Sequence, residues 1–240
     1  MLPTQQGSFH LFRLAGISVF LHWSWFLAAA YFLGERESAY PSLFWNLLKY
    51  LALFLIVLLH EFGHALACRQ VGGHADMIVL WPLGGVAYVA PPHRPGATLW
   101  SIAAGPLVNL VLFPVLTGAW LVAWAFGLAS PWPNLNGPIQ AVWTINLGLL
   151  IFNLLPIYPL DGGQILRSIL WFFIGPARSL MVTALVGFVG VAGLIAFALW
   201  VRDPWLGVMS AFILMNCWRG LMHARVLARE EALTADDRIG

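Results

Sequence analysis

Residues 41–68 read PSLFWNLLKYLALFLIVLLHEFGHALAC, an apolar run long enough to cross a membrane as one helix. Its charged side chains are Lys49 and Glu61, and Glu61 is flanked by His60 and His64. In hydrocarbon an ionisable side chain is so unfavourable that it is usually paired, bound to a metal or turned toward a wet cavity. These three residues therefore mark a functional site within a membrane.

The composition places the whole chain in a bilayer. Of its 240 residues 60% are hydrophobic and 9% are charged, whereas soluble domains have about 25% charged residues. The fold class expected is an all-α polytopic membrane protein with about six transmembrane helices, one core at 1–224 and a polar cytoplasmic tail at 225–240. Apolar stretches of membrane length predict the crossings at 15–33, 44–68, 98–127, 138–158, 179–201 and 204–222.

The basic residues predict the orientation, because short cytoplasmic loops carry an excess of Lys and Arg. If the N-terminus is cytoplasmic, nine of the 12 basic residues lie inside and only Arg36, Lys49 and Arg202 outside. Both termini are therefore expected in the cytoplasm. The net charge of +2 reflects this topology and gives no reason to expect nucleic acid as a partner.

Two segments interrupt the helical pattern. In residues 71–92, Gly and Pro residues flank short β-prone runs. This pattern predicts a β-hairpin or re-entrant loop between the second and third crossings. Residues 138–175 contain Pro156, Pro159 and Gly162-Gly163, which must break the fourth helix. Irregular backbone at membrane depth is tolerated where protein or a water-filled cavity satisfies it, and such breaks often build binding sites.

The pattern His-Glu-Phe-Gly-His is typical of a zinc site with hydrolytic chemistry. On a helix His60 and His64 share one face, so that both imidazoles can bind one ion, and Glu61 lies about 100° further round within reach of a water molecule. A catalytic zinc takes three protein ligands and keeps an open position for water. One further ligand must therefore come from elsewhere.

Asp161 is the candidate for that third ligand. Apart from Glu61 it is the only acidic residue in an apolar segment, and the broken backbone around it can aim its side chain toward the second crossing. The alternative is a turn or helix-capping role, for which Asp-Gly pairs are common.

Four motifs together carry a resemblance that spans residues 12 to about 175. They are His60–His64, the loop WPLGGVA at 81–87, AGPLVN at 104–109 and FNLLPIYPLDGG at 152–163. In this order they resemble the site-2 protease family of intramembrane zinc metalloproteases. Residues 16–22 are also similar to the family's first helix.

The resemblance implies a site and a reaction. His60, His64 and Asp161 would hold one Zn²⁺ per chain, Glu61 would be the general base, and Asn153 would position substrate or stabilise the oxyanion. The 71–92 hairpin, with Gly84 and Gly85, would receive the substrate as an added strand. The chain looks like a minimal form without the CBS or PDZ domains of many relatives.

The same resemblance implies the partners and the location. The substrates would be single-span membrane proteins, such as an anti-sigma factor or signal-peptide remnants. The enzyme would be an endopeptidase in the lipid bilayer of a prokaryotic inner membrane, working in regulated intramembrane proteolysis.

The alternative function is a divalent-metal transporter, since transporter helices also carry His and Glu. A conduction path, however, needs polar ligands at several depths, and here they cluster at one depth. Among the secondary candidates, Asn109 is expected to hydrogen-bond across helices, His22 has an open role and Cys68 is expected to pack.

Overall fold

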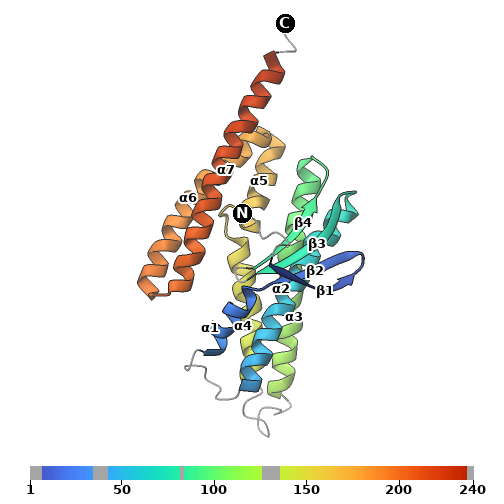
Figure 1. The fold of residues 1–240 in the computed structure, drawn as a ribbon, viewed down its shortest axis with the longest axis vertical. Coiled ribbons are helices and arrows are strands. Elements are labelled where there is room, and N and C mark those ends of the chain that lie inside the picture. The colour runs from blue at the N-terminus through green and yellow to red at the C-terminus, as the bar shows by residue number, and fades with distance from the viewer. Residues whose placement is uncertain (1–6, 35–42, 82–83, 126–135, 237–240) are drawn as a thin grey trace. The chain divides into compact units, whose positions relative to one another are not determined.

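The computed structural model describes residues 7–34, 43–81, 84–125 and 136–236, drawn in colour in Figure 1. The chain divides into two compact units. The first comprises residues 1–92 and 104–151, and the second comprises residues 93–103 and 152–240.

The signature-bearing run forms a single 28-residue helix, α2 (Leu43–Gln70). Its inner face is apolar at helical spacing, and Val57, Leu58, Phe62 and Ala65 are buried in the core of the first unit. The predicted crossing at 44–68 is thus a helix, and it carries the histidines in its C-terminal half.

The N-terminal region differs from the prediction. Residues 17–22, expected to open a crossing at 15–33, instead form strand β2 (Ile17–His22), which pairs antiparallel with β1 (Ser8–Leu14). The turn between them has positive φ at both Ala15 and Gly16, a conformation that suits two-residue hairpins. Only α1 (Trp25–Gly34) is helical within that stretch. The prediction was wrong for 15–22 because hydropathy summed over the run concealed an alternation in which Ile17 and Val19 are buried and their neighbours less so.

The segment after α2 forms two more strands, β3 (His74–Trp81) and β4 (Gly84–Ala90), which pair antiparallel. The two predicted β-prone runs, 77–81 and 86–89, fall within them; Pro82 and Leu83 of the loop lie outside the described residues. Because β2 pairs with β3 in parallel, the four strands make one sheet in the order β1-β2-β3-β4. An all-α fold is therefore corrected to a mostly helical fold with a small mixed sheet.

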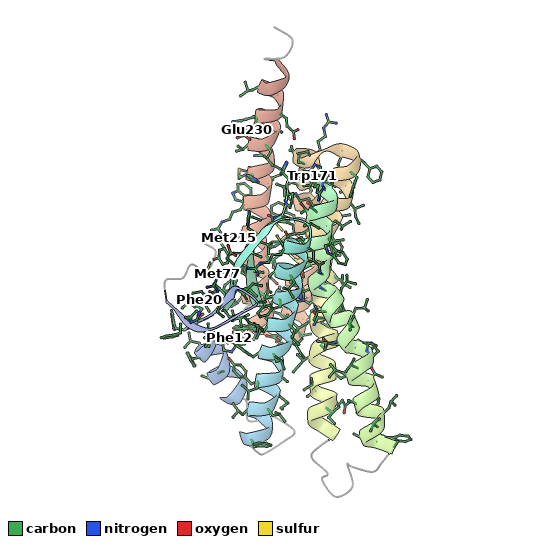
Figure 2. All side chains as sticks on the ribbon, turned by 90° about the vertical axis from the view of Figure 1, so that its right-hand side faces the viewer. Phe12, Phe20, Met77, Trp171, Met215 and Glu230 are labelled. Atoms are coloured by element: carbon green, nitrogen blue, oxygen red, sulfur yellow. The ribbon has the colours of Figure 1, made fainter. Side chains whose placement is uncertain are left out.

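The sheet packs against α2 through both β3 and β4 (Figure 1). Arg69 fastens this arrangement at the end of α2, since its guanidinium donates to the carbonyls of Ala15 and Gly16 and pairs with Asp76 at 3.1 Å. Figure 2 shows the side chains of Phe12 and Phe20 on the two N-terminal strands and of Met77 on β3.

Two further helices complete the first unit, α3 (Pro95–Ala125) and α4 (Asn136–Leu154); both have one end in the second unit. α2 and α3 approach closely at Gly63, where an added Cβ would lie 2.7 Å from the carbonyl oxygen of Ala104. Only a residue without a side chain fits there.

The second unit contains α5 (Asp161–Ile174), α6 (Pro176–Val201) and α7 (Pro204–Asp236). The break between α4 and α5 confirms the prediction of an interrupted fourth helix. α6 and α7 run side by side as a helical hairpin (Figure 1). The predicted polar tail continues α7 as far as Asp236, and residues 237–240 lie outside the described residues.

Three helical segments are long and apolar enough to cross a membrane in the described part of the chain, namely 47–70, 95–125 and 176–201. The apolar part of α4, residues 139–154, is shorter.

Candidate functional site

The two histidines of α2 face each other. Their Nε2 atoms are 3.1 Å apart, and the two side chains are 5% and 6% exposed. Two nitrogens that each lie about 2.1 Å from one tetrahedral ion are about 3.4 Å apart. The spacing of His60 and His64 therefore suits two ligands of a single zinc ion.

The other ring nitrogen of His60 has its own partner. Its Nδ1 lies 2.6 Å from Oδ1 of Asn109 on α3. Asn109 in turn donates from Nδ2 to Oδ1 of Asn146 on α4, at 2.9 Å. The expectation that Asn109 hydrogen-bonds across helices is thus confirmed, and one of its partners is a residue of the zinc signature.

Gly105 on α3 makes room for both imidazoles. A Cβ at this position would lie 2.3 Å from Nε2 of His64 and 2.8 Å from Nε2 of His60. Separations below 3.0 Å are not compatible with packed atoms, so a methyl group at this position would overlap both imidazoles. The two histidines can therefore lie directly against α3 only because residue 105 has no side chain.

Glu61 is buried beside the sheet, with 6% of its surface exposed. Its Oε2 accepts a hydrogen bond from the backbone N–H of Ala87 in β4, at 2.8 Å. Gly85 allows this approach, since a Cβ there would lie 2.3 Å from Cγ of Glu61. The carboxylate of Glu61 therefore lies against β4, one of the two edge strands of the sheet.

The predicted substrate-binding glycines both belong to β4. Among the residues that the structure describes, β3 is the strand that β4 pairs with, so β4 forms one edge of the sheet. The N–H of Ala87 points to the other side, toward Glu61, and the alternation of a strand directs the backbone groups of Gly85 the same way. Gly84 has φ of +137°, which side-chain-bearing residues rarely adopt.

Asp161 and Asn153 belong to the second unit. Asp161 is the first residue of α5 and is partly buried. The N-cap residue of α5 is Leu160, so Asp161 does not have the helix-capping role considered as an alternative. Gly162 and Gly163 press the start of α5 against the preceding loop, because Cβ atoms on them would lie 2.3 Å and 2.5 Å from the backbone of Leu154 and Ile157. Asn153 lies in the last turn of α4 and is partly buried.

Sequence reasoning missed the contributions of Asn146 and Gly105. A polar Asn146 in an apolar helix was a signal, since intramembrane polar residues tend to have partners, but nothing local names the partner. The secondary candidates have local contacts: His22 pairs through Nδ1 with Ser24, and Cys68 is fully buried in the core of the first unit.

The chain combines helices of membrane length with a buried pair of histidines and a neighbouring carboxylate. These features place it in the class of integral membrane proteins with a metallopeptidase signature. The model of peptidase family M50 matches residues 49–130 and 128–197. The chain belongs to this family, and the resemblance to site-2 proteases is confirmed.

Individual relatives agree with the family. The chain is 35% identical over 182 residues to a zinc metalloprotease of Methanocaldococcus jannaschii, covering 75% of this chain and 50% of the relative. A relative from Synechocystis sp. is 31% identical over 245 residues, covering 94% of this chain and 63% of its own length. The chain thus spans between half and two thirds of the length of these two relatives.

A solved structure shows the same fold. The site-2 protease from Methanocaldococcus jannaschii superposes with a TM-score of 0.66 at 28% identity, covering 89% of this chain and 95% of that protein.

Proposed function

We propose that the chain is an intramembrane zinc metalloprotease, an endopeptidase that cleaves membrane-anchored proteins within their transmembrane segments. The observation that carries the proposal is the pair of buried, facing Nε2 atoms of His60 and His64, with Glu61 one residue along the helix and in contact with an edge strand. Membership of peptidase family M50 supports it.

The proposed ligands of one Zn²⁺ per chain are His60, His64 and Asp161. Two nitrogens and one carboxylate oxygen form a donor set known from catalytic zinc sites. His60 and His64 are buried and Asp161 is partly buried, so all three side chains are shielded from bulk water as zinc ligands usually are.

Glu61 is proposed as general base and then general acid. It takes a proton from the attacking water and passes it to the leaving amine. Zinc supplies Lewis-acid chemistry that makes the water acidic enough for this near neutral pH. Asn153 is proposed to donate from its amide to the developing oxyanion, a type of interaction whose loss costs about 3 kcal/mol in other hydrolases.

The proposed substrate adds as a strand to the outer edge of β4. Edge strands bind extended peptides through backbone hydrogen bonds, and the hydrogen bond from the Ala87 N–H to Glu61 supports this proposal because it lies on that edge of β4. A helical substrate must first unwind, because its carbonyls are engaged in its own hydrogen bonds. Substrates should therefore carry Gly, Pro or Asn near the cut, and single-span regulators of the anti-sigma type or signal-peptide remnants fit this description.

The membrane setting is proposed from charge and length. Six crossings, with both termini cytoplasmic and the prokaryotic inner membrane as location, are proposed from the apolar stretches and the nine-to-three distribution of basic residues. Arg36 and Arg238 of this count lie outside the described residues. The described helical part of the first crossing is the ten-residue α1.

Asp161→Ala tests the ligand set. We expect the purified full-length variant to bind zinc at least about 100-fold more weakly than the parent, because even changes beside a ligand weaken zinc affinity 10- to 100-fold. Competition with a chromophoric chelator measures this. Asp76→Ala, which removes a carboxylate paired with Arg69, is the matched control and should bind zinc like the parent. Equal affinity in Asp161→Ala would remove Asp161 from the site.

Gly85→Ala tests the contact between β4 and the base. The added methyl group would overlap Glu61, so we expect cleavage of a single-span test substrate to fall at least tenfold while zinc content stays unchanged. Gly148→Ala is the control, since a Cβ at Gly148 meets nothing within 4 Å. Normal cleavage by Gly85→Ala would show that Glu61 works away from this strand.

A further inference from the structure

Asn109 and Asn146 form a closed pair of amides behind His60. Both side chains are fully buried, and they lie on α3 and α4 respectively. Two hydrogen bonds link them: Nδ2 of Asn109 donates to Oδ1 of Asn146 at 2.9 Å, and Nδ2 of Asn146 donates to the backbone oxygen of Asn109 at 3.0 Å.

One backbone atom determines which group donates and which accepts in each of the hydrogen bonds that link Asn146, Asn109 and His60. A carbonyl oxygen can only accept, so the atom of Asn146 beside the backbone oxygen of Asn109 must be its NH₂ group. The remaining atom of that amide is an oxygen, and it must face the NH₂ group of Asn109. The oxygen of Asn109 is therefore the atom that faces His60.

This orientation determines which nitrogen of His60 carries the proton. Oδ1 of Asn109 has no hydrogen to give, so the ring must donate from Nδ1 across the 2.6 Å contact. A neutral imidazole protonated at Nδ1 has its lone pair at Nε2. Nε2 is the atom that faces Nε2 of His64 and that a metal would use.

We propose that Asn109 and Asn146 are positioning residues that hold His60 in its Nδ1–H tautomer and thereby set the affinity of the site for zinc. Asn109 supplies the acceptor, and Asn146 prevents the Asn109 amide from turning its NH₂ group toward the ring. Partners of this kind orient metal-binding histidines and change metal affinity by about 10- to 100-fold. The inference rests on the proposed function, because it takes His60 as a zinc ligand.

Three variants of the protein, purified in detergent, test the proposed role of Asn109 and Asn146. Asn109→Leu removes the hydrogen-bond acceptor of His60 at similar side-chain volume, whereas Asn109→Asp keeps an acceptor there. Asn146→Leu removes only the side chain that fixes the orientation of the Asn109 amide. We expect Asn109→Leu to bind zinc about 10- to 100-fold more weakly than the parent, Asn109→Asp to bind at least tenfold more tightly than Asn109→Leu, and Asn146→Leu to lie between parent and Asn109→Leu. Chelator competition measures all three.

The matched control is Asn216→Leu. Asn216 lies on α7 and donates to a carbonyl of its own helix, that of Phe212. This variant loses a side-chain amide within a helix but leaves Asn109 and Asn146 unchanged, so its zinc affinity should equal that of the parent. At saturating zinc, Asn109→Leu should also recover most of its cleavage rate, since its chemistry is intact.

A spectroscopic measurement separates positioning from a purely structural role. The ¹⁵N shifts of the metal-free parent, with His60 assigned by comparison with His60→Gln, should show a proton on Nδ1, and Asn146→Leu should show a mixture of tautomers. The proposal is overturned if His60 is protonated at Nε2 in the parent, or if Asn109→Leu binds zinc within threefold of the parent. A parent that binds no zinc would instead overturn the proposed function.

Discussion

Glu61→Gln should abolish cleavage while the protein keeps its zinc. Glutamine has the shape of glutamate, and its amide oxygen can still accept the N–H of Ala87, so the fold around β4 is retained. It cannot take a proton from water, however, and loss of a general base typically lowers a rate about 10²- to 10⁴-fold. Cleavage of a single-span test substrate in detergent or liposomes, alongside metal analysis of the same preparation, measures both quantities.

The same variant distinguishes the enzyme from a divalent-metal transporter. Sealed vesicles that hold the parent should take up no zinc beyond empty vesicles, and Glu61→Gln should behave alike. Zinc uptake that survives Glu61→Gln, together with no cleavage by the parent, would favour transport. Unchanged cleavage by Glu61→Gln would show that Glu61 is not the general base.

Gly105→Ala should empty the zinc site. The new methyl group would lie within 3 Å of the metal-facing nitrogens of both histidines, and His60 cannot retreat without breaking its bond to Asn109. We expect zinc affinity to fall at least about 100-fold, beyond the range seen for changes that only touch a ligand's partner, and cleavage to fall with it. Helix propensity works in the opposite direction, since alanine favours a helix by up to about 1 kcal/mol over glycine.

Two controls isolate the steric effect. Gly118→Ala lies on the same helix, and its Cβ meets nothing within 4 Å, so it should bind zinc normally. Gly105 also precedes Pro106, and a residue before proline resists the helical conformation. Zinc binding by Pro106→Ala, but not by Gly105→Ala/Pro106→Ala, would assign the loss to the methyl group; binding by the double variant would contradict the prediction.

Much of the first unit's site was predictable because its signals are local. The i, i+4 spacing of His60 and His64 puts them on one helical face whatever surrounds the helix, and their burial follows from the apolar run. The interruption before Asp161 was predictable for the same reason, since Pro156 and Pro159 are followed by Gly162-Gly163, and this combination within a few residues disfavours a continuous helix.

The remaining features depend on contacts between distant segments. Asn146 reaches His60 only through Asn109, a link from α4 through α3 to α2 that no spacing along the chain encodes. The N-terminal strands were missed because an apolar strand and an apolar helix look alike to hydropathy, and the parallel pairing of β2 with β3 that completes the sheet is non-local. The Ala15-Gly16 turn was the one local clue.

Within the part of the chain that the structure describes, the sheet ends in two edge strands of unequal use. One is β1 and the other is β4, and three strand spacings, about 14 Å, separate them. A polypeptide that docks along β1 would be retained but not hydrolysed, since Glu61 lies beside β4. Affinity measured for a peptide therefore need not track its turnover, and a tight ligand of the β1 edge would be neither a competitor nor a substrate.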